Sequence, residues 1–251
     1  MVINNSDIVH RKCELLSHVY EVYDQIAESF ESSCHRDCLA CCTSGVIATT
    51  LEMLPIIEFL QQSPVGRYYD DALAIPDERK TRPTLTINDL ARHCLERIEP
   101  PQEKSILSTV PCPLRDDNGC SVYEVRPFHC RSMFSSIKCR VDGAATMDPL
   151  IISLNGVFEQ VIEHIDRGGF VGNMLNLLAA FDNVEFQESY NRSGEAYAKP
   201  PLLRAQPNPG FVVLPEHRQE IAAALAKLWE KNVRGIPFRD AMNLETTPTR
   251  F

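Results

Sequence analysis

The sequence predicts a mainly α protein: a single irregular domain whose helices surround cysteine-rich loops organised by metal. Three observations support this prediction. Apolar residues recur at helical spacing along much of the chain, turn-forming segments separate these stretches, and eight of the ten cysteines fall into two groups. With 251 residues, the chain is long enough to bury a core without a disulfide scaffold.

Helices are predicted at three places in the first half of the chain. Residues 7–32 carry apolar side chains at alternating steps of four and three, which is typical of a long amphipathic helix. A second helix begins at Thr50, and the charged, proline-containing stretch 63–86 is expected to be a surface excursion. Apolar residues at helical steps over 87–98 predict a short third helix.

The second half is also predicted to be mainly helical, because a cap followed by proline at Asp148-Pro149 is a strong helix start. The expected elements are a helix from Asp148 to Gly168-Gly169, a short helix over 171–182, a polar loop or linker over 187–210, a strand over 211–214, a helix from Pro215, and a loosely held tail after 240. Residues 1–142 would form a helical, cysteine-cluster metal-binding domain, and residues 143–251 a helical extension packed on the same core.

Charge and hydropathy exclude several classes of protein. The net charge is −9 and the pI is about 5.3, whereas nucleic acids and anionic membranes attract basic surfaces. The N-terminus lacks the apolar region of a signal peptide, and no apolar stretch approaches the length of a membrane span. We therefore expect a cytoplasmic protein, with no nucleic acid and no membrane among its partners.

The cysteines are the feature that points to function. The first group is Cys34, Cys38, Cys41 and Cys42, and the second is Cys112, Cys120, Cys130 and Cys139. In a reducing compartment, clustered thiols are more often metal ligands than disulfides. Turn residues surround the second group, so the fold and not one local turn must assemble its thiols. We predict that all eight bind metal.

Thiolate ligands select zinc or an iron–sulfur cluster, and the sequence leaves this choice open. Adjacent residues point in different directions, so Cys41 and Cys42 would serve two ions or bridge them. This pair slightly favours a cluster over an independent zinc site. Arg126 and Arg131 lie close to the second group, where they would offset the negative charge of a thiolate site and donate hydrogen bonds to it.

The remaining cysteines and the histidines carry weaker signals. Cys13 and Cys94 lie on apolar helical stripes and are expected in the core. His35 and His129 lie inside the cysteine groups, where either could replace a thiol as a ligand, but each is more simply explained by a supporting or surface contact. The glycine-rich segment 168–172 follows a predicted helix and not a strand, so it is interpreted as a helix stop and not as a nucleotide-binding loop.

These residues resemble the YkgJ-type cysteine-cluster family, a zinc- or iron-chelating domain known by its CxxCxxCC motif. The matching residues are Cys34, Cys38-x-x-Cys41-Cys42, Cys112-Pro113-Leu114, Cys120-x-Val122-Tyr123-Glu124-x-Arg126-Pro127 and Cys130-Arg131. The resemblance covers roughly residues 30–142. One interval departs from the family, because three residues instead of two separate Cys34 from Cys38.

The resemblance implies metal or iron–sulfur binding and leaves the biochemical role open. Flagellin lysine N-methylases contain a similar cysteine arrangement, so a protein-modifying methyltransferase with a protein substrate is one alternative. The others are a redox protein and a structural zinc module that supports an interaction. The sequence does not decide between an enzyme and a binding protein, and it leaves the oligomeric state open.

Overall fold

The structure is a computed structural model, and the class it shows is mainly α, as predicted. The residues that it describes are 5–62, 74–76, 80–101, 110–116, 119–139, 145–197 and 201–244. Within these stretches, no helix combines the length and the apolar composition needed to cross a bilayer.

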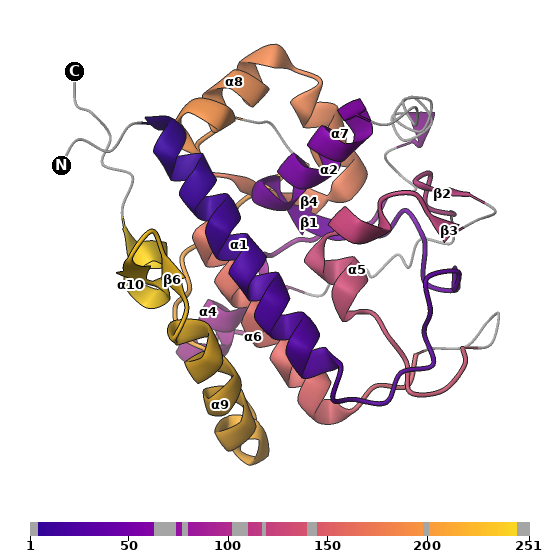
Figure 1. Ribbon diagram of the computed structural model, residues 1–251, viewed down its shortest axis with the longest axis vertical. Coiled ribbons are helices and arrows are strands. Elements are labelled where there is room, and N and C mark those ends of the chain that lie inside the picture. The colour runs from indigo at the N-terminus through magenta and orange to yellow at the C-terminus, as the bar shows by residue number, and fades with distance from the viewer. Residues whose placement is uncertain are drawn as a thin grey trace.

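Two long helices form the centre of the molecule (Figure 1). Helix α1 (Asn5–Ala27) crosses α6 (Pro149–Ile165), and their apolar faces bury each other. The Tyr23 ring on α1 packs edge-on against two rings, those of Phe128 at 4.6 Å and Phe158 at 5.5 Å between centroids. This aromatic cluster joins both helices to the segment that carries the second cysteine group.

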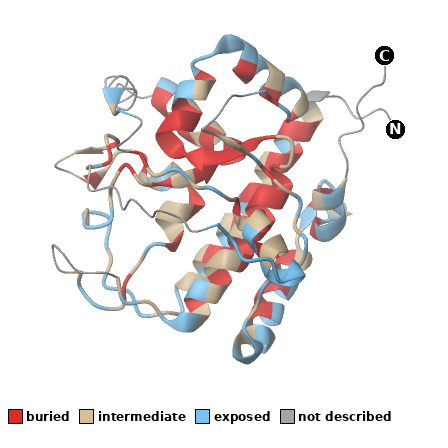
Figure 2. Cartoon of the chain, turned by 180° about the vertical axis from the view of Figure 1, so that it is seen from behind, coloured by how far each residue is buried: buried red, intermediate tan, exposed pale blue. Residues whose placement is uncertain are grey.

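A small antiparallel sheet forms the second centre of packing. Its strand order is β1 (Ile47–Thr49), β4 (Phe170–Asn173) and β5 (Leu203–Arg204). Helix α2 (Thr50–Gln62) follows β1 directly, and α7 (Met174–Phe181) follows β4 directly. All four residues of β4 are buried, and Figure 2 shows this sheet as part of the buried interior.

Shorter elements complete the fold around these two centres. They are α4 (Ile87–Glu96), β2 (Arg115–Asp116), β3 (Gly119–Cys120), the 3₁₀ turn η2 (Tyr123–Val125), α5 (Phe128–Ser132), α8 (Val184–Ser193), η3 (Pro215–His217), α9 (Arg218–Trp229), β6 (Asn232–Val233), β7 (Ile236–Pro237) and α10 (Phe238–Asn243). Both hydrophobic clusters contain residues from before and after residue 142.

A buried ionic group ties the two centres together. Asp166, which is fully buried, accepts hydrogen bonds from the Leu51 N–H (3.0 Å) and from the hydroxyl of Tyr190. The buried Lys12 ammonium lies 3.8 Å from this carboxylate and donates to the Gly194 carbonyl (3.0 Å). Buried charges of this kind need both a counter-charge and hydrogen bonds, and here they have both.

The strongest helix signals in the sequence are confirmed, with one boundary changed. Helices α2, α4 and α6 lie where they were predicted, and the Asp148 side chain caps α6 at the Leu150 N–H (2.8 Å). Helix α1 ends at Ala27 and not at residue 32. The Ser29 hydroxyl donates to the Ile26 carbonyl (2.6 Å), and such local bonds compete with continuation of a helix.

Four other expectations were wrong. Residues 170–173 form strand β4, because they lie between β1 and β5, and α7 begins only at Met174. Within the expected loop 187–210, α8 extends to Ser193, since buried Phe186 and Tyr190 are one helical turn apart. Residues 211–214 pair with no strand in the described part of the chain. Cys94 is exposed, not in the core.

Two predictions fall partly on undescribed residues. Of the expected surface excursion, the residues in 63–73 and 77–79 lie outside the described stretches. Near its end, Lys80 and Thr86 are buried, and Thr86 caps α4 at the Asp89 N–H (3.1 Å). In the expected loose tail, α10 continues to Asn243 and buries Ala241, while residues 245–251 lie outside the described stretches.

Candidate functional site

The first cysteine group lies on the irregular segment between α1 and β1. Two turns fold this segment, with the Cys38 N–H donating to the His35 carbonyl (2.9 Å) and the Cys42 N–H to the Leu39 carbonyl (3.2 Å). These turns place the thiols on one short stretch that curls back on itself. The segment is mostly exposed or half-buried, so few apolar contacts fix it.

Backbone pairing joins the two cysteine groups. The Cys112 N–H donates to the Cys42 carbonyl (3.0 Å), and Thr43 and Pro111 form an isolated antiparallel bridge beside it. Residues that are seventy positions apart in the sequence are therefore neighbours. The eight thiols belong to one region of the molecule and not to two separate sites.

The hairpin β2–β3 brings Cys120 back toward Cys112. In this hairpin Arg115 lies opposite Cys120, and the Ser121 N–H donates to the Leu114 carbonyl (2.9 Å). Gly119 has a φ of +117°, and a Cβ at this position would lie 3.1 Å from the Arg36 carbonyl oxygen. Glycine is therefore required where the hairpin passes close to the first cysteine group.

Cys130 is presented by the short helix α5, which a buried carboxylate holds in place. Glu52, at the start of α2, accepts hydrogen bonds from the Phe128 N–H (2.6 Å), the Tyr20 hydroxyl (2.8 Å) and the Thr49 N–H (2.8 Å). Desolvation raises the pKa of Glu52, while these hydrogen bonds oppose that shift. Glu52 thus fixes the first turn of the helix that carries the thiol.

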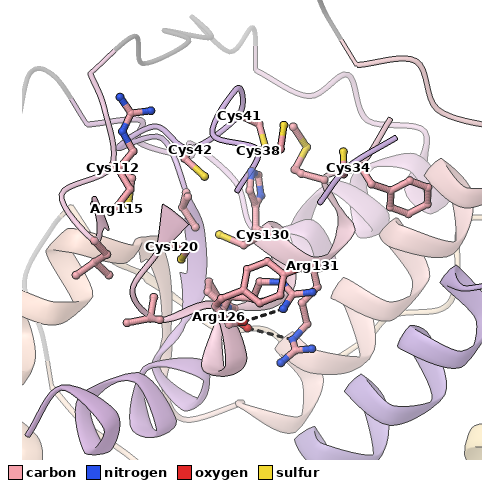
Figure 3. A pocket seen from close by; sticks show the side chains of 18 of the residues that line it. Cys34, Cys38, Cys41, Cys42, Cys112, Arg115, Cys120, Arg126, Cys130 and Arg131 are labelled. Carbon is pink, nitrogen blue, oxygen red and sulfur yellow. Dashed lines mark hydrogen bonds between the residues drawn. The ribbon is translucent and has the colours of Figure 1, made fainter. Parts of the chain in front are cut away.

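The thiols surround a cavity of about 680 Å³ (Figure 3). Seven of the eight predicted ligands line it: Cys34, Cys38, Cys41, Cys42, Cys112, Cys120 and Cys130. The eighth, Cys139, does not line the cavity. In Figure 3 the side chains of Cys42, Cys120 and Cys130 point toward a shared space, and Cys34 lies at the other end of the cavity. The structure therefore brings thiols from both sequence groups to one cavity.

Electrostatic neighbours show how the thiols divide along the cavity. Burial raises the pKa of the Cys34 thiol, and three neighbouring thiols raise it further; they are Cys38, Cys41 and Cys139. The Ser135 N–H donates to the Cys34 sulfur (3.3 Å), which links this end to the segment leading to Cys139. Cys139 therefore belongs with the first sequence group in space.

The other end of the cavity gathers thiols from both sequence groups. Burial raises the pKa of the Cys130 thiol, and the neighbouring thiols Cys112, Cys120 and Cys41 raise it further. Burial also raises the pKa of Cys112, to about 11. Burial of this kind disfavours thiolates, and a bound cation reverses that preference.

Cys41 and Cys42 differ sharply, although they are adjacent. Their side chains are hydrogen-bonded, which lowers the pKa of Cys41 to about 6 and raises the pKa of Cys42. Cys41 is also the most exposed of the two. The hydrogen bond therefore favours ionisation of Cys41 over ionisation of Cys42.

The two predicted arginines line the cavity but have different contacts. Arg126 lies 3.9 Å from the centroid of the Tyr123 ring, and its charge lowers the pKa values of Cys120 and Cys130 against the larger effect of burial. Arg131 donates to the Asp24 carboxylate (2.8 Å), to two backbone carbonyls of the η2 region, and stacks over an aromatic ring of α1. Arg131 is thus a clamp between α1 and α5.

Sequence reasoning missed two further arginines beside the thiols. The charge of Arg36 opposes the raised pKa of Cys120, and Arg36 pairs with Glu124 (2.9 Å). The charge of Arg115 does the same for Cys112. Each of these arginines lies between two cysteines of one group in the sequence. That position was the signal that could have identified them as neighbours of the thiols.

The thiols do not form a closed set of metal ligands. Among the described residues, no three side chains of His, Cys, Asp or Glu are close enough together to hold a metal ion. For comparison, the four sulfurs around one zinc ion lie about 3.8 Å apart, given Zn–S distances of about 2.3 Å. The cavity is therefore lined by thiols of which no described three meet around one point.

Protein side chains occupy the space beside the glycines of segment 168–172. Gly168 has a φ of +96° in the turn after α6, which confirms its interpretation as a helix stop. A Cβ on Gly169 would lie 2.5 Å from the Asp166 carboxylate, and one on Gly172 would lie 2.5 Å from the Leu202 side chain. These close contacts leave no room for a phosphate group at either glycine.

Comparisons of the chain with protein-family models, with curated proteins and with solved structures gave no match. The resemblance to the YkgJ-type family therefore rests on the cysteine motif alone and stays a prediction.

Proposed function

We propose that this protein binds an iron–sulfur cluster through its cysteine-lined cavity. The observation that carries the proposal is the convergence of seven thiols from residues 34–42 and 112–130 on one cavity of about 680 Å³. Such convergence has no use in an ordinary hydrophobic core. Thiolate-rich sites bind zinc or iron–sulfur clusters, because soft sulfur ligands prefer these centres.

The spacing of the thiols favours a cluster over a single zinc ion. One zinc ion requires its four sulfurs in mutual contact, and no described set of three ligands is that close. A cluster places several iron and sulfide atoms between the thiolates, so its ligands stand farther apart. Space between lining thiols is what a cluster needs.

The electrostatic neighbours suggest a division of the thiols into two sets. One set is Cys34, Cys38 and Cys139, and the other is Cys42, Cys112, Cys120 and Cys130, while Cys41 neighbours members of both. Cys41 and Cys42 are hydrogen-bonded to each other, so this adjacent pair lies where the two sets meet. All four thiols of the second set, which we call the inner set, line the cavity. We propose that the inner set holds the cluster.

The chain's own residues support such a centre in two ways. Arg126 and Arg115 place positive charge next to the inner thiols, which favours their ionised form. Ligation would also fix the loosely packed cysteine segments, and structural metal sites contribute about 10 kcal/mol or more to folding. The centre would serve redox chemistry or the modification of a protein substrate.

The proposal is tested by anaerobic purification followed by analysis of iron, zinc and acid-labile sulfide on one sample. We expect iron and sulfide in equal amounts and the visible absorption of a cluster. Cys42→Ser and Cys130→Ser should each lose most of the iron, because each removes a thiol of the inner set. Cys94→Ser is the matched control, since Cys94 is an exposed cysteine on α4 outside the cavity.

Other outcomes have clear meanings. Stoichiometric zinc without sulfide would replace the cluster by a zinc site and favour a structural module. Full metal content in both Cys42→Ser and Cys130→Ser would refute the cavity as the binding site. Loss of only part of the metal in Cys34→Ser, with the cluster spectrum retained, would support the division into two sets.

A further inference from the structure

A second cavity, of about 490 Å³, lies against the wall of the thiol cavity. Its walls come from β1, α2, α4, α5, α6 and β4, and most of its lining is apolar, including Leu85, Ile87, Ile162 and Val171. A volume of this size is typical of small-molecule sites. Ile47 and His129 line both cavities and separate them.

Three carboxyl groups line this apolar space, and two of them have their oxygens occupied. Glu52 accepts the three hydrogen bonds that hold the starts of α2 and α5. Glu163 accepts from the Asn88 N–H (2.8 Å) with one oxygen and from the Gln206 N–H (2.7 Å) with the other. Both are therefore satisfied by the protein itself.

The third carboxyl group, that of Glu159, is different. It lies on α6 one turn before Glu163 and lines the cavity, and no described residue donates a hydrogen bond to it. The residue is half-buried in the cavity wall, and the surrounding protein desolvates its carboxyl group enough to raise its pKa from 4.5 to about 7, with the charges of Glu52 and Glu163 as smaller causes. A partly desolvated carboxylate without a protein donor gains from a ligand that supplies one.

We propose that this second cavity binds organic ammonium ions, meaning a primary or secondary amine on an apolar body, with the ammonium group donating to Glu159. Among the described residues that line the cavity, none is a lysine or an arginine. The carboxyl groups therefore repel anions, and a cationic donor is the group that complements them. The apolar walls accommodate the hydrocarbon part of the same ligand.

An inorganic cation fits this cavity less well than an ammonium ion. A divalent ion needs several free oxygen ligands at once, whereas the oxygens of Glu52 and Glu163 already accept backbone hydrogen bonds. No set of three metal-binding side chains occurs among the described residues. A single free carboxylate in an apolar pocket matches one ammonium head on an apolar stem.

The test is calorimetric titration of the whole protein with three probes that share one body: hexylammonium, hexan-1-ol and hexanoate. At pH 8 we expect hexylammonium to bind at least tenfold more tightly than hexan-1-ol, and hexanoate not to bind. In Glu159→Gln the advantage of the ammonium probe should disappear, while the alcohol binds as before. Glu220→Gln, on the exposed face of α9, is the control and should retain the advantage.

A second measurement on the unmodified protein keeps the inference testable if Glu159→Gln does not fold. The affinity for hexylammonium should rise between pH 6 and pH 8, as Glu159 gives up its proton, while the affinity for hexan-1-ol should not. The ionisable groups that face Glu159 are Glu163 on α6, Glu52 on α2, His129 on α5 and Tyr23 on α1.

Three results would overturn the inference. The first is equal affinity for hexylammonium and hexan-1-ol, which would make the cavity a purely apolar one. The second is an ammonium advantage that persists in Glu159→Gln. The third is displacement of hexylammonium by calcium chloride at matched ionic strength, which would identify an inorganic cation site. Iron or zinc content plays no part in these measurements, so they stand apart from the test of the thiol cavity.

Discussion

Replacing Glu159 by glutamine should stabilise the protein at pH 8 but hardly at all at pH 5. The carboxyl group is desolvated and has no described hydrogen-bond donor, which raises its pKa from 4.5 to about 7. A folded-state pKa above the unfolded value means that the folded protein binds the proton more tightly. Stability from this group is therefore complete below pH 4.5 and is lost as the pH rises through 7.

The magnitude follows from the size of the shift. Each pKa unit corresponds to about 1.4 kcal/mol, so the difference between 4.5 and about 7 amounts to about 3 kcal/mol. Most of this loss, about 2.5 kcal/mol, falls between pH 5 and pH 8. Glutamine has the same shape and cannot ionise, so Glu159→Gln avoids the loss.

Urea unfolding of both proteins at pH 5, 6, 7 and 8 measures the effect. The variant should gain about 2.5 kcal/mol on the wild type over this range, and Glu220→Gln should follow the wild type, because Glu220 is exposed. Glu163, His164 and Asp166 also have shifted pKa values, but they are present in all three proteins, so the part of their contribution that is independent of Glu159 cancels in the comparison. A difference that stays constant from pH 5 to pH 8 would refute the desolvation argument.

Three further predictions concern charged residues. Asp166→Ala should lower the free energy of unfolding in urea by about 3–5 kcal/mol, because it leaves the buried Lys12 ammonium without its counter-charge. The double variant Asp166→Ala with Lys12→Met should recover part of this loss. If the losses of the two single variants simply add in the double variant, the pairing is contradicted. Arg131→Ala should lower the unfolding free energy by about 1–3 kcal/mol through loss of its bonds to Asp24, yet keep the metal-to-protein ratio. Arg126→Ala should instead change the redox potential of a bound centre with little loss of stability, and an unchanged potential would remove Arg126 from the site.

The helical framework was predictable because its signals are local. Asp148 and Pro149 form a cap and a first turn that depend only on neighbouring residues, and α6 starts there. Strand β4 was not predictable, because residues 170–173 are a strand only through pairing with β1 and β5, which lie far away in the sequence. Cys94 shows the same limit, since an apolar periodicity does not reveal which helical face meets the core.

The candidate site was predictable in its composition but not in its arrangement. Clustering of cysteines identified the thiols that line the cavity, because eight of the ten cysteines fall within residues 34–42 and 112–139. The sequence could not show that Cys42 and Cys112 are joined by a backbone hydrogen bond, or that Cys139 lies near Cys34. Both facts arise from pairing between distant segments, and they replace two sequence groups by a different division in space.

One turn of helix links the two cavities. On α5, Phe128 lines the second cavity, His129 lines both, and Cys130 lines the thiol cavity. The position of this turn depends on Glu52, which accepts the Phe128 N–H from its place at the start of α2. A residue outside every cysteine motif therefore sets the position of a thiol. Phe128 and Cys130 lie on the same five-residue helix, so the hydrogen bond that fixes Phe128 beside the second cavity also fixes the backbone that presents Cys130 to the thiol cavity.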